Sequence, residues 1–391
     1  MRAGLPGRLP RGLHPVAWWL WAIALATAAS QTTNPLLLLL IFAVLGLVVS
    51  LRRTDAPWAR GYKFYLLMAL TVIAIRVVFR VVFESGVSPG QTILFRLPRI
   101  PTPSWYSGVQ IGGPVTVSGV VSATLDGARL ACLLCCIGAA NTLANPKRAL
   151  RVLPGALYEL GVAVTVALSV APQLVESVQR VRRARQLRGA GGGRGGGRGA
   201  LRAIAIPVLH DALERSLRLA AGMDSRGYGR VGSATRASRR VTGALMLGGL
   251  AGLCLGAYGL LGSTEPGGLG LGGFIAGAGL CVAGLVLGGR RVSRSRYRPD
   301  PWRWPEWVVT GCGLVSAVVL CLNLGAGQAA LNPPVYPLHW PPLPVLPTVA
   351  ILVAGLAAFV SPPPPVLAAP AGEPGAAARA GAELTGSGAA R

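Results

Sequence analysis

Two segments of the sequence end with an arginine followed by a glycine. The first reads Leu187-Arg188-Gly189 and the second reads Ser225-Arg226-Gly227. A planar guanidinium donates two parallel hydrogen bonds to a carboxylate, in a geometry that an ammonium group cannot match. Each arginine could therefore bind an acidic partner. Glycine after the last helical residue is also an ordinary helix end, where a cation suits the helix dipole, so the pattern alone favours a purely structural interpretation.

The sequence contains few other residues that could bind a metal, react or bind ATP. Cys132-Leu-Leu-Cys135 has the spacing of a metal or redox pair, but it lies in an apolar run without histidine, which favours a buried helix face. His14, His210 and His339 are scattered, so we expect no metal site and no cofactor. No Gly-x-x-x-x-Gly-Lys-Ser/Thr sequence occurs, and the chain therefore lacks the usual ATP-binding loop.

The composition is that of a membrane protein. Of the 391 residues, 52% are hydrophobic and 13% are charged, whereas soluble domains carry about 25% charged residues. The net charge of +25 comes from 38 Lys and Arg against 13 Asp and Glu. Such an excess suits nucleic acid, but here it lies between long apolar stretches. That placement is typical of cytoplasmic loops under the positive-inside rule.

Apolar stretches predict an all-α polytopic membrane protein with about eight spans, since a spanning helix needs about 20 apolar residues. The predicted spans are 16–30, 35–51, 62–83, 119–143, 241–262, 269–289, 306–323 and 344–361. With the N-terminus inside, the basic clusters at 52–63, 147–151 and 290–303 are cytoplasmic and the sparsely charged 84–118 loop is outside. Arg76 and Arg80 share one face of the third span, facing either the protein interior or the outer interface.

The segment 145–240 is expected to be a cytoplasmic or interfacial insert of helices. Residues 155–175 are apolar enough to span, but basic clusters flank them on both sides, and a crossing would leave one cluster outside. A second helix from Ile204 is amphipathic, with Leu209, Leu213 and Leu217 on one face. The predicted organisation is 1–144 membrane helices, 145–240 insert, 241–361 further membrane helices and 362–391 a disordered tail. The glycine-rich stretch 189–199, with two arginines and no aromatic, is interpreted as a flexible linker rather than an RNA-binding tract.

Several motifs occur in a characteristic order. They are Leu13-His14-Pro15, Leu125-Asp126-Gly127-Ala128-Arg129, Asn141-Thr142-Leu143-Ala144-Asn145-Pro146, Leu187-Arg188-Gly189 and Met223-Asp224-Ser225-Arg226-Gly227-Tyr228-Gly229. In this order the chain resembles the transmembrane component of energy-coupling factor transporters, the EcfT/CbiQ family. The resemblance covers most of residues 13–240. Two departures stand out: Leu187 and Ser225 precede the arginines where the family favours Ala.

The resemblance implies a non-catalytic scaffold whose coupling helices dock into two ATP-binding-cassette ATPase subunits. The implied docking residues are Leu187, Arg188, Gly189, Ser225, Arg226 and Gly227. A substrate-specific membrane subunit, the S component, is expected on the apolar face of the first coupling helix, at Leu157, Leu160, Val164 and Leu168. The implied cargo is a vitamin or a transition-metal ion, taken up across the plasma membrane.

The apolar and basic composition also suggests two other functions. A stand-alone secondary transporter or permease needs ionisable or discontinuous-helix sites near the midplane, and the spans carry almost no charge apart from Arg76 and Arg80. A membrane-anchored nucleic-acid-binding protein predicts retention that falls steeply with salt. The family resemblance favours the coupling subunit, with the lipid bilayer as its solvent and no nucleic-acid partner.

Overall fold

The computed structural model describes residues 12–53, 61–84, 91–100, 110–187, 197–228, 236–261, 268–289, 301–337 and 339–362. The chain divides into two compact units: Met1–Pro146 together with Asp300–Arg391, and Lys147–Pro299. In the described part of both units nearly all regular structure is helical, as the apolar stretches predict.

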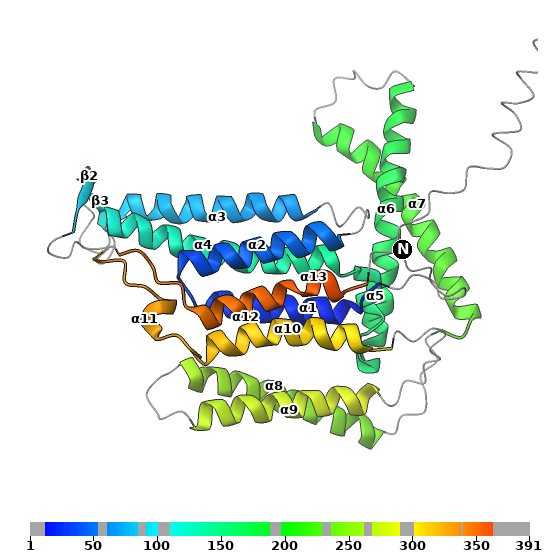
Figure 1. Cartoon of the computed structure of the whole chain (residues 1–391). Coiled ribbons are helices and arrows are strands. Elements are labelled where there is room, and N and C mark those ends of the chain that lie inside the picture. The colour runs from blue at the N-terminus through cyan, green and yellow to red at the C-terminus, as the bar shows by residue number, and fades with distance from the viewer. Residues whose placement is uncertain are drawn as a thin grey trace, which may run out of the picture. The chain divides into compact units, whose positions relative to one another are not determined.

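The first unit is a bundle of helices that run in alternating directions (Figure 1). Its long helices begin or end close to the predicted bounds, and four of its described helices come from residues 304–360. The helices are α1 (Pro15–Ser30), α2 (Pro35–Arg52), α3 (Tyr62–Val82), α4 (Val117–Leu143), α10 (Trp304–Cys321), α11 (Gln328–Leu331), α12 (Val345–Gly355) and α13 (Ala357–Val360).

Proline after a polar residue starts each of the first two helices. The Val16 N–H donates to Nδ1 of His14 at 3.3 Å, and the Leu36 N–H donates to Oδ1 of Asn34 at 3.0 Å. These side chains occupy the N-cap, and Pro15 and Pro35 take the first helical position, where a missing N–H costs nothing. The predicted break between the two helices at residues 31–35 is therefore confirmed.

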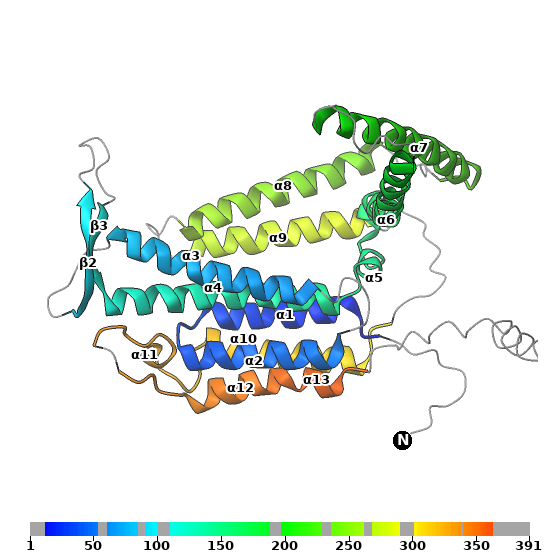
Figure 2. The same ribbon diagram turned by 90° about the horizontal axis from the view of Figure 1, so that it is seen from above.

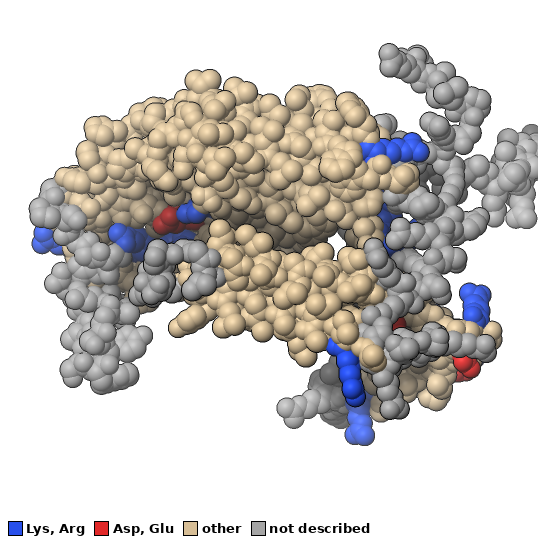
Figure 3. Space-filling model, turned by 90° about the horizontal axis from the view of Figure 1, so that it is seen from below, with Lys and Arg blue, Asp and Glu red and all other residues tan. Residues whose placement is uncertain are grey.

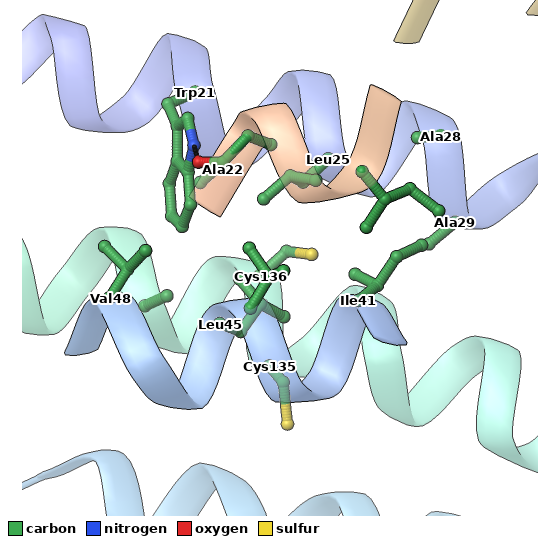
Figure 4. Close-up of a cluster of buried hydrophobic side chains, with 14 of the residues drawn as sticks. Trp21, Ala22, Leu25, Ala28, Ala29, Ile41, Leu45, Val48, Cys135 and Cys136 are labelled. Carbon is green, nitrogen blue, oxygen red and sulfur yellow. Dashed lines mark hydrogen bonds between the residues drawn. The ribbon is translucent and has the colours of Figure 1, made fainter. Parts of the chain in front are cut away.

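The core of the first unit lies between α1, α2 and α4 (Figure 4). Trp21, Leu25 and Leu45 have no exposed side-chain surface, and the indole N–H of Trp21 donates to the Ala354 carbonyl at 3.0 Å. Cys132 and Cys135 are free and fully buried on the α4 face that meets this cluster. The interpretation of Cys132-Leu-Leu-Cys135 as a buried helix face is confirmed.

A small antiparallel sheet joins α3 to α4, where the sequence predicted a loop. Its strands are β1 (Phe83–Glu84), β2 (Ile93–Ile100) and β3 (Gln110–Thr116), in the order β1-β3-β2, with Leu97 opposite Gly113. The prediction of a loop over 84–118 was wrong for these residues. Arginines and a proline at 96–99 obscure the strand pattern, and the pairing joins residues far apart in the chain.

Seven described helices are long and apolar enough to cross a membrane, and two shorter apolar helices accompany them. All eight predicted spans are helices: six are among the seven, and 16–30 and 344–361 are the shorter two. The remaining long helix contains the 155–175 segment. In the space-filling view broad charge-free bands cover the helices, and most of the charged side chains gather toward their ends (Figure 3). The chain is a multi-pass membrane protein.

The second unit contains two helical pairs. α6 (Tyr158–Leu187) and α7 (Gly197–Ser225) cross each other, and α8 (Arg236–Leu261) packs along α9 (Gly268–Gly289), as seen in Figure 2. Short helices α5 (Pro146–Leu150) and η2 (Gly155–Leu157) lead into α6. α8 and α9 approach closely because glycines line their contact: a Cβ on Gly277 would lie 2.4 Å from the Leu253 nitrogen.

Candidate functional site

The second arginine–glycine motif ends α7 in a Schellman cap. The Tyr228 N–H donates to the Met223 carbonyl at 3.0 Å, and the Gly227 N–H donates to the Asp224 carbonyl at 2.8 Å. Gly227 has φ +74, a left-handed conformation that side chains with a Cβ adopt at a cost. The sequence predicted this helix end, and the hydrogen bonds confirm it.

The cap places Arg226 on the surface at the tip of α7. Arg226 is exposed, and so is Ser225, whose hydroxyl donates to the Gly222 carbonyl at 3.0 Å. The Tyr228 ring that follows lies 6.2 Å from the ring of Tyr158 at the start of α6. Burial, together with the neighbouring Tyr158 and Glu159, raises the pKa of Tyr228. The exposed Arg226 guanidinium is thus held on a helix end of defined shape.

The first motif is only partly described. α6 ends at Leu187, whose side chain is 89% exposed, while Arg188 and Gly189 lie outside the described residues. The face of α6 that leads to this end carries Glu176, Arg180, Arg183 and Leu187. Figure 1 shows the C-terminal ends of α6 and α7 at separate places within the unit. Two separate tips can engage two separate partners.

Polar side chains hold the crossing of α6 and α7 together. Ser177 of α6 donates its hydroxyl to Oδ2 of Asp211 at 2.9 Å. Arg215 of α7 donates to the same Asp211 oxygen at 3.2 Å and to Oε1 of Gln173 at 2.9 Å. These residues belong to none of the sequence motifs. Asp211 and Arg215 have the spacing of an ion pair on one helix face, but no local signal assigns Ser177 and Gln173 to them.

The predicted apolar face at the start of α6, which begins at Leu157 in η2, is partly exposed. Leu160 and Leu168 are 57% and 39% exposed, and Leu157 and Val164 are half-buried. α6 has the length and composition of a span, whereas its basic flanks favour the interface. In either location this face offers an apolar surface to a membrane-embedded partner.

The remaining motif residues have structural roles in the first unit. Arg129 of α4 donates to the Ser30 carbonyl, at the end of α1. Asn141 donates to the Tyr65 hydroxyl at 2.9 Å, and Gly127 lets α4 approach the α3 backbone at Ile73. Arg80 lies against the start of α4, beside Thr116, so its side chain faces protein.

No group of three or more His, Cys, Asp or Glu residues suited to a metal ion occurs among the described residues. The histidines lie in separate parts of the chain. His14 caps α1 and contacts the Trp302 ring at 5.1 Å, while His210 is exposed on α7.

Comparison with known proteins agrees with this geometry. The family model described as CbiQ, cobalt transport protein, matches residues 7–236, a range that ends at the start of α8. The energy-coupling factor transporter transmembrane protein EcfT of Brevibacillus brevis is 27% identical over 177 residues. That alignment covers 42% of this chain and 62% of the relative, less than two thirds of its length. With more than half of its residues matched, the chain belongs to the CbiQ family of cobalt transport proteins.

Proposed function

We propose that this chain is the transmembrane coupling subunit of an ATP-driven energy-coupling factor importer. In this function it is non-catalytic: two ATP-binding-cassette ATPases hydrolyse ATP, and the chain carries their movement to a substrate-binding membrane subunit. The observation that carries the proposal is the exposed Arg226 on a Schellman-capped helix end, within a chain of this family.

The ATPase-docking residues are Arg226, Gly227 and Ser225 at the tip of α7, and Leu187, Arg188 and Gly189 at the end of α6. An exposed arginine on a fixed helix end loses little side-chain freedom on binding and can enter an acidic groove as a bidentate donor. The separate tips of α6 and α7 support one ATPase at each tip. The excess of basic residues in 145–240 supports a cytoplasmic location for this insert.

The substrate-binding membrane subunit docks on the apolar face of α6, at Leu157, Leu160, Val164 and Leu168. The exposed Leu160 and Leu168 support this assignment. The chain lies in the plasma membrane with its N-terminus in the cytoplasm, because the basic residues near 52–63 and 147–151 then fall inside. The cargo is a transition-metal ion or a vitamin, and the description of the family as cobalt transport proteins supports the metal ion.

Affinity purification of the tagged chain from native membranes tests the assignment. We expect two ATPase subunits and a small membrane protein to be recovered with the wild-type chain. Replacing Arg188 and Arg226 together by Ala should reduce ATPase recovery at least about tenfold, as is usual for anchoring arginines at an interface. The membrane subunit should still be recovered, since the α6 face is unchanged.

A double variant at Arg182 and Arg218 is the matched control. These arginines are exposed on the same two helices but lie away from the helix ends. Removing them subtracts the same charge, and ATPase recovery should stay near the wild-type amount. If the Arg188 and Arg226 variant keeps its ATPases and its uptake, the docking assignment is wrong. A wild-type chain that is recovered alone would favour a stand-alone permease.

A further inference from the structure

α6 and α7 cross near the middle of each helix (Figures 1 and 2), and a second contact joins the Tyr158 ring at the start of α6 to the Tyr228 ring just after α7. The only buried side chains at the crossing are small: Ser177 is 3% exposed and Val208 is 9% exposed, whereas most other described side chains of the two helices are exposed or half-buried. At the crossing itself little apolar surface is therefore available to hold the two helices together. Directional hydrogen bonds must do so instead.

Asp211 is the shared acceptor in this contact. Its Oδ2 accepts from the Ser177 hydroxyl across the crossing and from Arg215 on its own helix, and Arg215 reaches back to Gln173 of α6. The four side chains thus form a closed connection between the helices, which we term the polar clasp. Because Asp211 accepts from two donors, its removal loosens the whole polar clasp.

Each helix also contains a proline beside the polar clasp. Pro172 precedes Gln173 in α6, and Pro207 precedes Val208 in α7. A proline inside a helix removes one backbone hydrogen bond and weakens the helix at that point. Both helices are thus least stiff next to the place where the polar clasp joins them.

We propose that the polar clasp keeps the crossing of α6 and α7 closed while the bound ATPases change conformation, and that Asp211 is the positioning residue on which it depends. The proposal rests on the coupling function proposed above. The stretch from Asp211 to Arg226 is about 22 Å long, so a change of about 10° at the crossing moves the tip by about 4 Å. A loose crossing would absorb the movement that the tips receive.

The polar clasp is a positioning device rather than a source of stability. The side chains of Asp211 and Arg215 are 39% and 36% exposed, and ion pairs this exposed to solvent contribute little to folding. Asp211→Ala, which removes the shared acceptor, should therefore fold and keep its ATPases. Uptake per ATP hydrolysed should fall about fivefold or more, in the range of typical coupling between sites.

α7 itself provides the matched control. Glu214 and Arg218 form an ion pair of the same spacing on the same helix, with side chains 55% and 77% exposed, and among the described residues neither donates or accepts a hydrogen bond across to α6. Glu214→Ala should leave uptake per ATP unchanged. Equal losses in Asp211→Ala and Glu214→Ala would show that the loss of a carboxylate from α7, and not the loss of the polar clasp, reduces coupling, and would overturn the proposal.

A reversible disulfide tests closure directly. In the double variant Ser177→Cys with Asp211→Cys, uptake should be low in reductant and should return on oxidation, because the disulfide replaces the missing contact. Neither α6 nor α7 contains a native cysteine, so the wild-type chain given the same treatment is the control. Uptake that stops on oxidation and returns on reduction would show that the crossing must open, and the proposal would be wrong.

A wrong coupling proposal would give a different result from a wrong polar-clasp proposal. The wild-type chain would then neither recover ATPases nor support uptake, and substitutions at position 211 would change neither result. Rapid disulfide formation between residues 177 and 211 in the intact membrane would then still support a closed crossing. Absence of the disulfide under strong oxidation would contradict it.

Discussion

At the scale of single residues, the shape of the α7 tip depends on Gly227. Arg226 can present its guanidinium reproducibly only if the last turn of α7 is fixed, and the two hydrogen bonds of the Schellman cap fix it. Those bonds require the left-handed backbone at Gly227. Arg226 thus supplies the charge at this site, and Gly227 supplies the geometry.

Gly227→Ala should therefore weaken the α7 tip without affecting the membrane helices. The added Cβ costs about 1 to 2 kcal/mol in a left-handed conformation, so the cap should fray. Hydrogen exchange of the amides at 226–228 should accelerate, and ATPase recovery should fall several-fold. Gly222→Ala is the control: Gly222 lies inside the same helix, with no atom within 4 Å of an added Cβ. If both variants behave alike, the cap is not what positions Arg226.

At the scale of elements, the sequence predicted the features that depend on residues close together in the chain, namely the helices and their ends. Apolar runs and capping residues gave the helices closely, as at 35–51 against Pro35–Arg52 and at 269–289 against Gly268–Gly289. The motif at Arg226 was found because a helix end is also local. The β-sheet and the polar clasp were missed, since Leu97 and Gly113, or Ser177 and Asp211, are joined only by the fold.

The α8–α9 pair shows how far glycine spacing controls an element contact. An added Cβ at Gly277 would overlap the Leu253 nitrogen and the Gly252 carbonyl carbon. Both are backbone atoms, which cannot rotate away as a flexible side chain can. Gly277→Ala should force the helices apart and cost about 1 to 3 kcal/mol, the usual range for overpacking. Thermal unfolding in detergent should show a lower Tm.

Gly279→Ala on the same helix is the control for that experiment. An added Cβ at Gly279 meets no atom within 4 Å, and alanine is the better helix former, so the Tm should hold or rise slightly. A Tm for Gly277→Ala equal to that of Gly279→Ala would contradict the close contact between α8 and α9.

At the scale of the whole molecule, the residues matched by the family and the residues that form the first unit are not the same. The match ends at residue 236, but α10 and α12 pack against α1 and α2 in the first unit. Their connection also supplies the polar partners of the α1–α2 turn. The fully buried Thr32 hydroxyl donates to the Leu331 carbonyl at 2.6 Å, and the fully buried Asn34 amide donates to Ala330 and Pro342 at 2.9 and 2.8 Å.

At the opposite end of the bundle, Arg52 donates to the Ala358 and Phe359 carbonyls at the end of the last helices. The C-terminal helices are thus joined to α1 and α2 at both ends and, through Trp21 and Ala354, in the middle. Residues 301–362 are therefore part of the membrane bundle and not an appended domain.

Ending the chain after residue 299 should consequently prevent the first unit from folding. Thr32 and Asn34 would lose the partners that hold the α1–α2 turn in place, and the apolar faces of α1 and α2 would lose their cover. We expect little monodisperse protein by size-exclusion chromatography. Co-expression of 300–391 as a separate chain should restore it, because the contacts are non-covalent. Ending the chain after residue 362 removes no described contact and should leave yield and Tm unchanged. A stable 1–299 fragment with wild-type Tm would show instead that the family-matched part folds without the C-terminal helices.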